Sequence, residues 1–251
     1  MREGERPHPT SHPSGICDPV AELEGGANSI REGGNLLLEG RDYPPQIQRW
    51  YERLAPFVEH ARDALHGVDP ADVARRTGCL YEADGTLRLA LFREGYTIQP
   101  ATWTVCHRDT GEKPTEFTQA LILTYLISAD GTPPSGRWIG YRDLPDGMFY
   151  AQAFRGYAEL RLGRELGDGG LARFRAAAGV LGGTEIEIGD AGYAFTVLPH
   201  VHLGAVYWLG DEDFPSRTSI LFEDTAPHYL STDGLAVLGS HLVNALLDAA
   251  P

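Results

Sequence analysis

Apolar residues recur every three or four positions near the start of the regular part of the chain, in residues 44–67. This spacing predicts an amphipathic helix, whose apolar face holds Ile47, Trp50, Leu54, Phe57, Val58, Ala61 and Leu65. A shorter helix is predicted at residues 69–78. Asp69 can cap its first turn, Pro70 suits its first helical position, and Gly78 can end it.

The same periodicity predicts helices in the rest of the chain, at residues 114–131, 148–166, 169–183 and 229–249. In the second of these, one apolar stripe is expected to face the core, formed by Phe149, Ala153, Tyr157 and Leu160. The last helix begins at a cap formed by Ser231 or Thr232. It is expected to turn its leucines inward, at Leu235, Leu238, Leu242 and Leu246.

Between these helices the pattern changes to an alternation of apolar and polar residues, which is typical of strands. Hairpin turns are indicated at Asp84–Gly85, Glu94–Gly95 and Gly189–Asp190. Because strands and helices come in blocks joined by hairpins, the pattern predicts an α+β fold with a mainly antiparallel sheet packed with helices. The sheet is expected to carry residues near 86–92, 192–198, 202–208 and 217–222.

The chain divides into an extension and a body. Residues 1–44 are rich in proline, glycine and charge, and Leu36–Leu38 is their one apolar cluster. Such a segment buries too little apolar surface to offset its ordering entropy, so we expect it to be flexible or loosely docked. Residues 45–251 are expected to form a single α+β domain.

The charge balance bears on the partners. The formal net charge is -14, and Lys113 is the single lysine, so no basic run offsets the acidic residues. A nucleic-acid backbone and an anionic membrane surface would both repel such a chain, and neither is expected as a partner. A small molecule or a protein remains as the partner class.

The cysteines and the first residues of the chain indicate in which cellular compartment the protein is expected. Cys17, Cys79 and Cys106 form no C-x-x-C pair, which argues against a zinc ribbon or an iron–sulfur cluster held by this chain alone. An odd cysteine count without a disulfide framework suits a reducing compartment. Residues 1–15 lack the apolar core of a secretory signal, and no stretch reaches the roughly 18 apolar residues of a membrane span. We therefore expect a cytoplasmic location.

An acidic loop is the first candidate for chemistry. Asp211, Glu212 and Asp213 are consecutive between two predicted strands, and Phe214–Pro215 closes the loop. One interpretation is a charged turn in which the aspartates bind local backbone amides. The other is a hard-metal or proton-transfer site. In that case Phe214 would pack on the core and leave carboxylates aimed at a pocket beside Trp208.

A pair of histidines is the second candidate. His200 and His202 alternate on one predicted strand and therefore point to the same face. Two imidazoles can share a transition metal if a third ligand arrives, which Asp190 or Asp213 could supply. The alternative is that both are polar residues of an edge strand.

These candidates give two hypotheses from different function classes. The first is a binding protein that holds a small cofactor or docks a redox partner, through a pocket lined by Tyr150, Tyr193, Phe195, Tyr207, Trp208 and Phe214 beside the acidic loop. The second is a metal-dependent hydrolase that uses the acidic loop with the two histidines. The sequence holds no nucleophile elbow, phosphate-binding loop or zinc-protease motif. It identifies no cofactor, and whether the protein is an enzyme stays open.

Three longer stretches resemble a known family: residues 134–154 (PSGRWIGYRDLPDGMFYAQAF), residues 187–230 and the leucine-rich last helix. The most specific parts are Leu198–Pro199, Trp208–Pro215 and Ile220–Glu223. From about Leu80 to its end the chain resembles an uncharacterised bacterial and archaeal family, domain of unknown function 3786.

In some relatives this domain is fused to a four-cysteine iron–sulfur module, of the kind found in corrinoid proteins of anaerobic one-carbon metabolism. The cysteines of this chain do not form such a module. The resemblance implies an accessory protein that binds a small molecule or cofactor, with a link to corrinoid or iron–sulfur metabolism.

Overall fold

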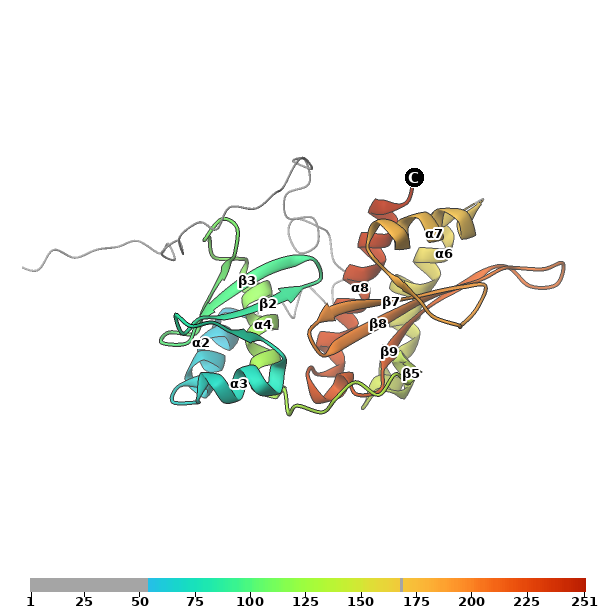
Figure 1. The fold of residues 1–251 in the computed structure, drawn as a ribbon. Coiled ribbons are helices and arrows are strands. Elements are labelled where there is room, and N and C mark those ends of the chain that lie inside the picture. Colours follow the sequence, from blue (N-terminus) through green and yellow to red (C-terminus); the bar gives the residue numbers. More distant parts are fainter. Residues whose placement is uncertain (1–53, 168) are drawn as a thin grey trace, which may run out of the picture.

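The computed structural model of the chain describes residues 54–251 except residue 168 (Figure 1). The expected extension, residues 1–44, and the start of the first predicted helix, including Ile47 and Trp50, lie outside the described residues. The described part contains helices and two antiparallel sheets, which confirms the α+β fold. None of its helices is long and apolar enough to cross a membrane.

The N-terminal lobe, residues 54–128, packs helices against a four-stranded antiparallel sheet in the order β1-β2-β3-β4 (Figure 1). Its elements are α2 (Leu54–Leu65), α3 (Pro70–Thr77), β1 (Leu80–Tyr81), β2 (Leu87–Leu91), β3 (Glu94–Gln99), β4 (Thr104–His107) and α4 (Glu116–Ser128). Strand β2 alternates between buried and more exposed residues, as expected for a sheet with one face on the core.

The C-terminal lobe, residues 138–251, holds a five-stranded antiparallel sheet in the order β5-β9-β8-β7-β6. It starts with β5 (Trp138–Gly140), the 3-10 turns η1 (Tyr141–Asp143) and η2 (Gly147–Phe149), α5 (Ala151–Phe154), the π-helical turn η3 (Arg155–Glu159), α6 (Leu160–Leu166) and α7 (Gly170–Val180). It continues with β6 (Thr184–Glu185), β7 (Ala191–Leu198), β8 (Val201–Trp208), β9 (Arg217–Glu223), η4 (Ala226–His228) and α8 (Thr232–Ala249).

The strands predicted for one sheet are divided between the two. The segment near 86–92 forms β2 of the first sheet, whereas the other three predicted segments form β7, β8 and β9 of the second. The two sheets meet where the backbone N–H of Phe92 donates to the carbonyl oxygen of Val197 at 2.7 Å. Apolar alternation sets the face that a strand buries but does not name its partner strand, so the division could not be read from the pattern.

The predicted hairpin turns hold at Asp84–Gly85 and shift at the next position. The Asp84 carboxylate accepts the backbone N–H of Thr86 at 2.9 Å and closes the first turn. Glu94 and Gly95, expected as the second turn, lie inside β3 instead. Phe92 makes that turn with a positive φ of 53°, a conformation that a bulky residue adopts only when its surroundings enforce it.

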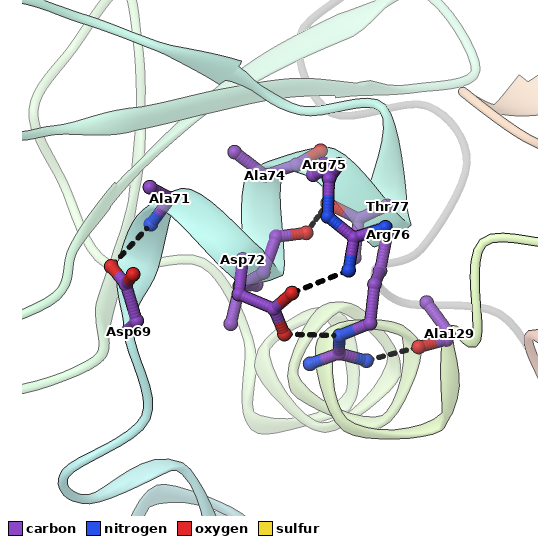
Figure 2. A network of polar contacts seen from close by, with 9 residues as sticks. Asp69, Ala71, Asp72, Ala74, Arg75, Arg76, Thr77 and Ala129 are labelled. Carbon is purple, nitrogen blue, oxygen red and sulfur yellow. Dashed lines mark hydrogen bonds and ion pairs between the residues drawn. The ribbon is translucent and has the colours of Figure 1, made fainter.

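The caps predicted for α3 are confirmed. The Asp69 carboxylate accepts the backbone N–H of Ala71 at 3.0 Å, and Gly78 ends the helix with a φ of 69°. Figure 2 shows how Asp72 also binds Arg76, which in turn reaches the carbonyl oxygen of Ala129 at the end of α4. The short helix α3 is thereby fastened to α4.

Tyr125 joins the two lobes. Its hydroxyl donates to the carbonyl oxygen of Thr77 at 2.6 Å and accepts the backbone N–H of His200 at 3.2 Å. Its ring stacks on Tyr229, with the ring centroids 5.7 Å apart. Burial raises the pKa of the Tyr125 hydroxyl, which therefore stays protonated and remains a donor. One hydrophobic core runs through both lobes.

The apolar stripe predicted for residues 148–166 is wrong at three of its four positions, and Tyr157 is the one that packs against the core. Phe149 is 83% exposed and Leu160 is 55% exposed. The residues that reach the core are instead Phe154, Ala158, Leu162 and Leu166. A 3.6-residue period fails here because the segment begins as a 3-10 turn and passes through the π turn, which widens the helix and shifts its register. In α8, by contrast, all four predicted leucines are buried. Ser231 caps this helix, and its hydroxyl oxygen accepts the backbone N–H of Gly234.

Candidate functional site: a groove beside the π turn

The acidic loop lies at the tip of the β8–β9 hairpin, which projects from the body (Figure 1). Asp211, Glu212 and Asp213 are all exposed. The Asp211 carboxylate accepts the backbone N–H groups of Asp213 at 2.9 Å and of Phe214 at 2.8 Å, so this residue builds the turn. Phe214 is 71% exposed, and the expectation that it anchors the loop on the core is wrong.

The aromatic residues expected to line a pocket serve different purposes. Tyr193 and Tyr207 are buried against Phe174 of α7, with ring centroids 5.8 and 5.9 Å apart. Trp208 lies at the base of the hairpin, where the Arg217 guanidinium sits 4.3 Å above its ring. These residues are therefore occupied by packing contacts. Tyr193 also lines a small hollow of about 150 Å³ beside Arg175 and Glu185.

The expected metal ligands do not come together. His202 is the second residue of β8, while Asp213 lies beyond the far end of that strand, and the strand between them spans roughly 20 Å. His202 contacts Thr196 at 3.2 Å, and the His200 ring packs on Tyr229 at 5.5 Å, where burial lowers its pKa. Asp190 accepts the backbone N–H of Leu209 at 2.7 Å. Within residues 54–251 apart from residue 168, no three His, Cys, Asp or Glu side chains gather as a metal-holding group.

A groove of about 490 Å³ lies on the C-terminal lobe, between the start of η1 and the π turn. We call it the π-turn groove. Its apolar wall comes from Tyr141, Met148, Ala151 and Phe154, and its polar groups are Arg142, Gln152, Arg155 and Glu159. A groove of this size is large enough to hold a small molecule, and its lining is about equally apolar and polar.

A tight reversal of the chain shapes one rim of this groove. Asp146 adopts a left-handed φ of 58°, a conformation that costs a non-glycine residue roughly 1 kcal/mol or more. Gly147 follows, and a Cβ atom there would collide with the carbonyl oxygen of Tyr141. Only glycine therefore lets the chain fold back and place Met148 beside Arg142, whose guanidinium lies 4.0 Å from the Met148 sulfur.

The π turn forms the opposite rim and is held by β9. The Thr218 hydroxyl donates to the backbone carbonyl of Glu159 at 2.6 Å, and the backbone N–H of Ile220 donates to the Glu159 carboxylate at 3.2 Å. These bonds fix a wide turn that the helix alone would not favour. Single π turns inside helices occur frequently at functional sites.

The titratable groups of the groove differ in their environments. Burial raises the pKa of Glu159, while the Ile220 N–H and the Arg155 charge act in the opposite direction. Arg142 and Arg155 are exposed, and neither lies within salt-bridge distance of a carboxylate in the described part of the chain. The groove thus offers two exposed guanidinium groups beside one carboxyl group whose pKa is raised by burial.

An aromatic cluster forms the floor. The Tyr141 and Phe154 rings stack at 4.4 Å with an interplanar angle of 12°, and Phe222 of β9 packs against both. Burial raises the pKa of Tyr141 to about 12, so its hydroxyl keeps its proton at neutral pH. We expect the floor to be rigid, because three rings from different elements pack against one another.

The sequence pattern does not predict the groove, although residues 134–154 contain most of its lining. Tyr150, adjacent to the groove, was expected to line a pocket, but Arg142, Arg155 and Glu159 were not singled out. The sequence signal that could have indicated the groove is the dipeptide Asp146–Gly147, which is typical of turns and lies between two aromatic residues. The Glu159–Ile220 contact spans too much sequence to have been inferred from spacing.

Comparison with known proteins leaves the groove without a characterised counterpart. No curated protein matches the chain. No solved structure matches it either. A family match covers residues 69–245, which is more than half of the chain, and the chain therefore belongs to the family described as Domain of unknown function (DUF3786).

Proposed function

We propose that this protein binds a small molecule and that its ligand occupies the π-turn groove. The observation that carries the proposal is the groove itself: about 490 Å³, with an aromatic floor and four polar side chains along its rims. The π turn is held by a tertiary hydrogen bond from β9, and the other rim is shaped by the close approach of Gly147 to Tyr141. A preformed groove of this kind loses little conformational entropy when a ligand enters.

The role that we propose is that of an accessory binding protein, and its link to corrinoid or iron–sulfur metabolism rests on the family resemblance alone. The described cysteines, Cys79 and Cys106, are both buried and belong to no metal-holding group of three or more side chains in residues 54–251 without residue 168. These residues do not fit an iron–sulfur cluster, so no step of the proposed function runs through one.

The alternative of a metal-dependent hydrolase receives no specific support from the geometry. Its named residues lie at opposite ends of β8, and catalysis by a bound metal needs three or four convergent ligands. The side chains of the acidic tip and of Phe214 are exposed to solvent. Binding in the groove is therefore the function that we put forward.

The test uses the full chain purified from its own cells and examined by native mass spectrometry. Ala151 lines the groove, so Ala151→Trp should fill it, whereas Ala153 is exposed on the same short helix and Ala153→Trp should not. We expect the wild type and Ala153→Trp to retain a small molecule that Ala151→Trp loses. Equal retention by both variants would place the ligand elsewhere and overturn the proposal.

If no molecule survives purification, thermal-shift screening of a metabolite library replaces native mass spectrometry, with the same pair of variants. A ligand that stabilises the wild type and Ala153→Trp but not Ala151→Trp supports the groove. Circular dichroism checks that both variants fold. A library in which every hit stabilises Ala151→Trp as strongly as the wild type would count against the groove as the site.

A further inference from the structure

The chemical class of the ligand can be inferred from the charges that face the π-turn groove, an inference that rests on the proposed function. Arg142 lies on the rim formed by η1, and Arg155 begins the π turn on the opposite rim. Both guanidinium groups are exposed and have no carboxylate partner within salt-bridge distance in the described residues. Guanidinium groups bind carboxylates and phosphates through two parallel hydrogen bonds.

Acidic groups near the groove have to be weighed against these arginines, and they include Asp233, whose charge acts on Tyr141 of the groove lining. Glu159 lines the groove, but its carboxylate already accepts the Ile220 N–H and burial disfavours its charged form. Asp143 approaches the groove near Gly140, at the edge where solvent screens its charge. Among the residues that line the groove, the two arginines outnumber Glu159, the acidic residue of that lining.

The rest of the lining suits an apolar body. Met148 and Ala151 flank the stacked rings of Tyr141 and Phe154, and the Met148 side chain is otherwise largely exposed to solvent. Covering the exposed Met148 side chain would remove apolar surface from water, at about 25 cal/mol for each Å². A flexible thioether next to aromatic rings also adapts readily to a planar partner.

We propose that the groove takes an organic anion, with a carboxylate or phosphate held between Arg142 and Arg155 and an aromatic or aliphatic body packed on Met148, Ala151 and Phe154. Glu159 is the last residue of the π turn that Arg155 begins, and both line the groove. Where it carries a proton it donates a hydrogen bond to the anion, and the anion in turn favours that protonated form.

The probes are benzoate, phenyl phosphate, benzylamine and benzyl alcohol, which share a ring and differ in charge. Titration calorimetry measures each with the full chain at low and at moderate salt. We expect one or both anions to bind, at least tenfold more tightly than the amine or the alcohol, and to weaken as salt rises. Benzoate and phenyl phosphate together decide which anionic group is preferred.

The matched variants are Arg142→Gln, Arg155→Gln and Arg164→Gln, the last at an exposed arginine of α6 outside the groove. Either of the first two should weaken the anion at least tenfold, and Arg164→Gln should leave its affinity within twofold of the wild type. Anion binding that survives both groove variants unchanged would overturn the inference.

The remaining outcomes separate the ligand class from the site. If benzylamine or benzyl alcohol binds as tightly as the anions and Ala151→Trp blocks it, the groove is a ligand site but the anionic class is wrong. If no probe binds and the retained ligand is unaffected by Ala151→Trp, the class and the proposed site both fail.

Discussion

The carboxylate of Glu159 accepts the backbone N–H of Ile220 at 3.2 Å, and this bond joins the π turn to β9. The residues are far apart in the chain, yet the bond fixes the one irregular turn of the helix that borders the groove. Glu159 is a half-buried carboxyl group with a structural partner, so its protonation state is linked to the shape of the groove.

The first prediction concerns pH. Burial raises the pKa of Glu159 above its ordinary value of 4.5, so the folded protein holds this proton more strongly than the unfolded chain does. The corresponding stability is fully present below pH 4.5 and is lost as the pH rises through the folded pKa. Glu159→Gln keeps an acceptor for Ile220 but cannot ionise.

We therefore expect the melting temperature of Glu159→Gln to gain on that of the wild type as the pH rises from 4.5 towards neutrality. Thermal unfolding followed by circular dichroism at several pH values measures the difference. Glu187→Gln, at an exposed site, is the control and should show no such trend. A difference that does not change with pH would mean that Glu159 is not desolvated in the folded protein.

The second prediction concerns the reversal at the rim of the groove. Gly147→Ala would drive a Cβ atom into the carbonyl oxygen of Tyr141, and it should destabilise the protein by about 1–3 kcal/mol. Gly179→Ala is the matched control, because the added Cβ meets nothing within 4 Å and the residue lies in α7. It should stabilise the protein by about 0.5–1 kcal/mol. Urea unfolding measures both, and equal effects would contradict the packing of the rim.

The third prediction concerns the joint between the lobes. Tyr125→Phe removes the hydroxyl that bridges the carbonyl oxygen of Thr77 and the backbone N–H of His200. Buried groups that lose their partners cost about 1–3 kcal/mol of unfolding free energy. Tyr81→Phe, at a tyrosine that is largely exposed, should change it by less than about 0.5 kcal/mol. If denaturant unfolding finds the two variants equally stable, Tyr125 does not hold the lobes together.

The fourth prediction concerns the hairpin tip. Phe214→Ala should change the unfolding free energy by no more than about 0.5 kcal/mol, because its side chain is 71% exposed. Phe154→Ala, which empties part of the aromatic floor, should cost about 3–5 kcal/mol. Guanidinium unfolding monitors both variants. A loss of several kcal/mol in Phe214→Ala would show that the tip packs on the body in solution.

Local interactions explain what the sequence determined by itself. The cap of Asp69, the end of α3 at Gly78, the turn at Asp84 and the buried leucines of α8 depend on residues a few positions apart. Their geometry is set by short-range hydrogen bonds and by the helical period, so the pattern of residue types suffices to predict them. The antiparallel α+β class followed from the same local turns.

Long-range packing decided the rest. The division of the strands into two sheets depends on contacts such as Phe92 with Val197, and the shifted face of residues 148–166 depends on the π turn that β9 holds through Glu159. The exposed position of Phe214 follows from a hairpin that extends beyond the core. Each of these features depends on the relative free energies of contacts between residues far apart in the chain, which residue spacing does not encode. The π-turn groove forms because such contacts bring its two rims together.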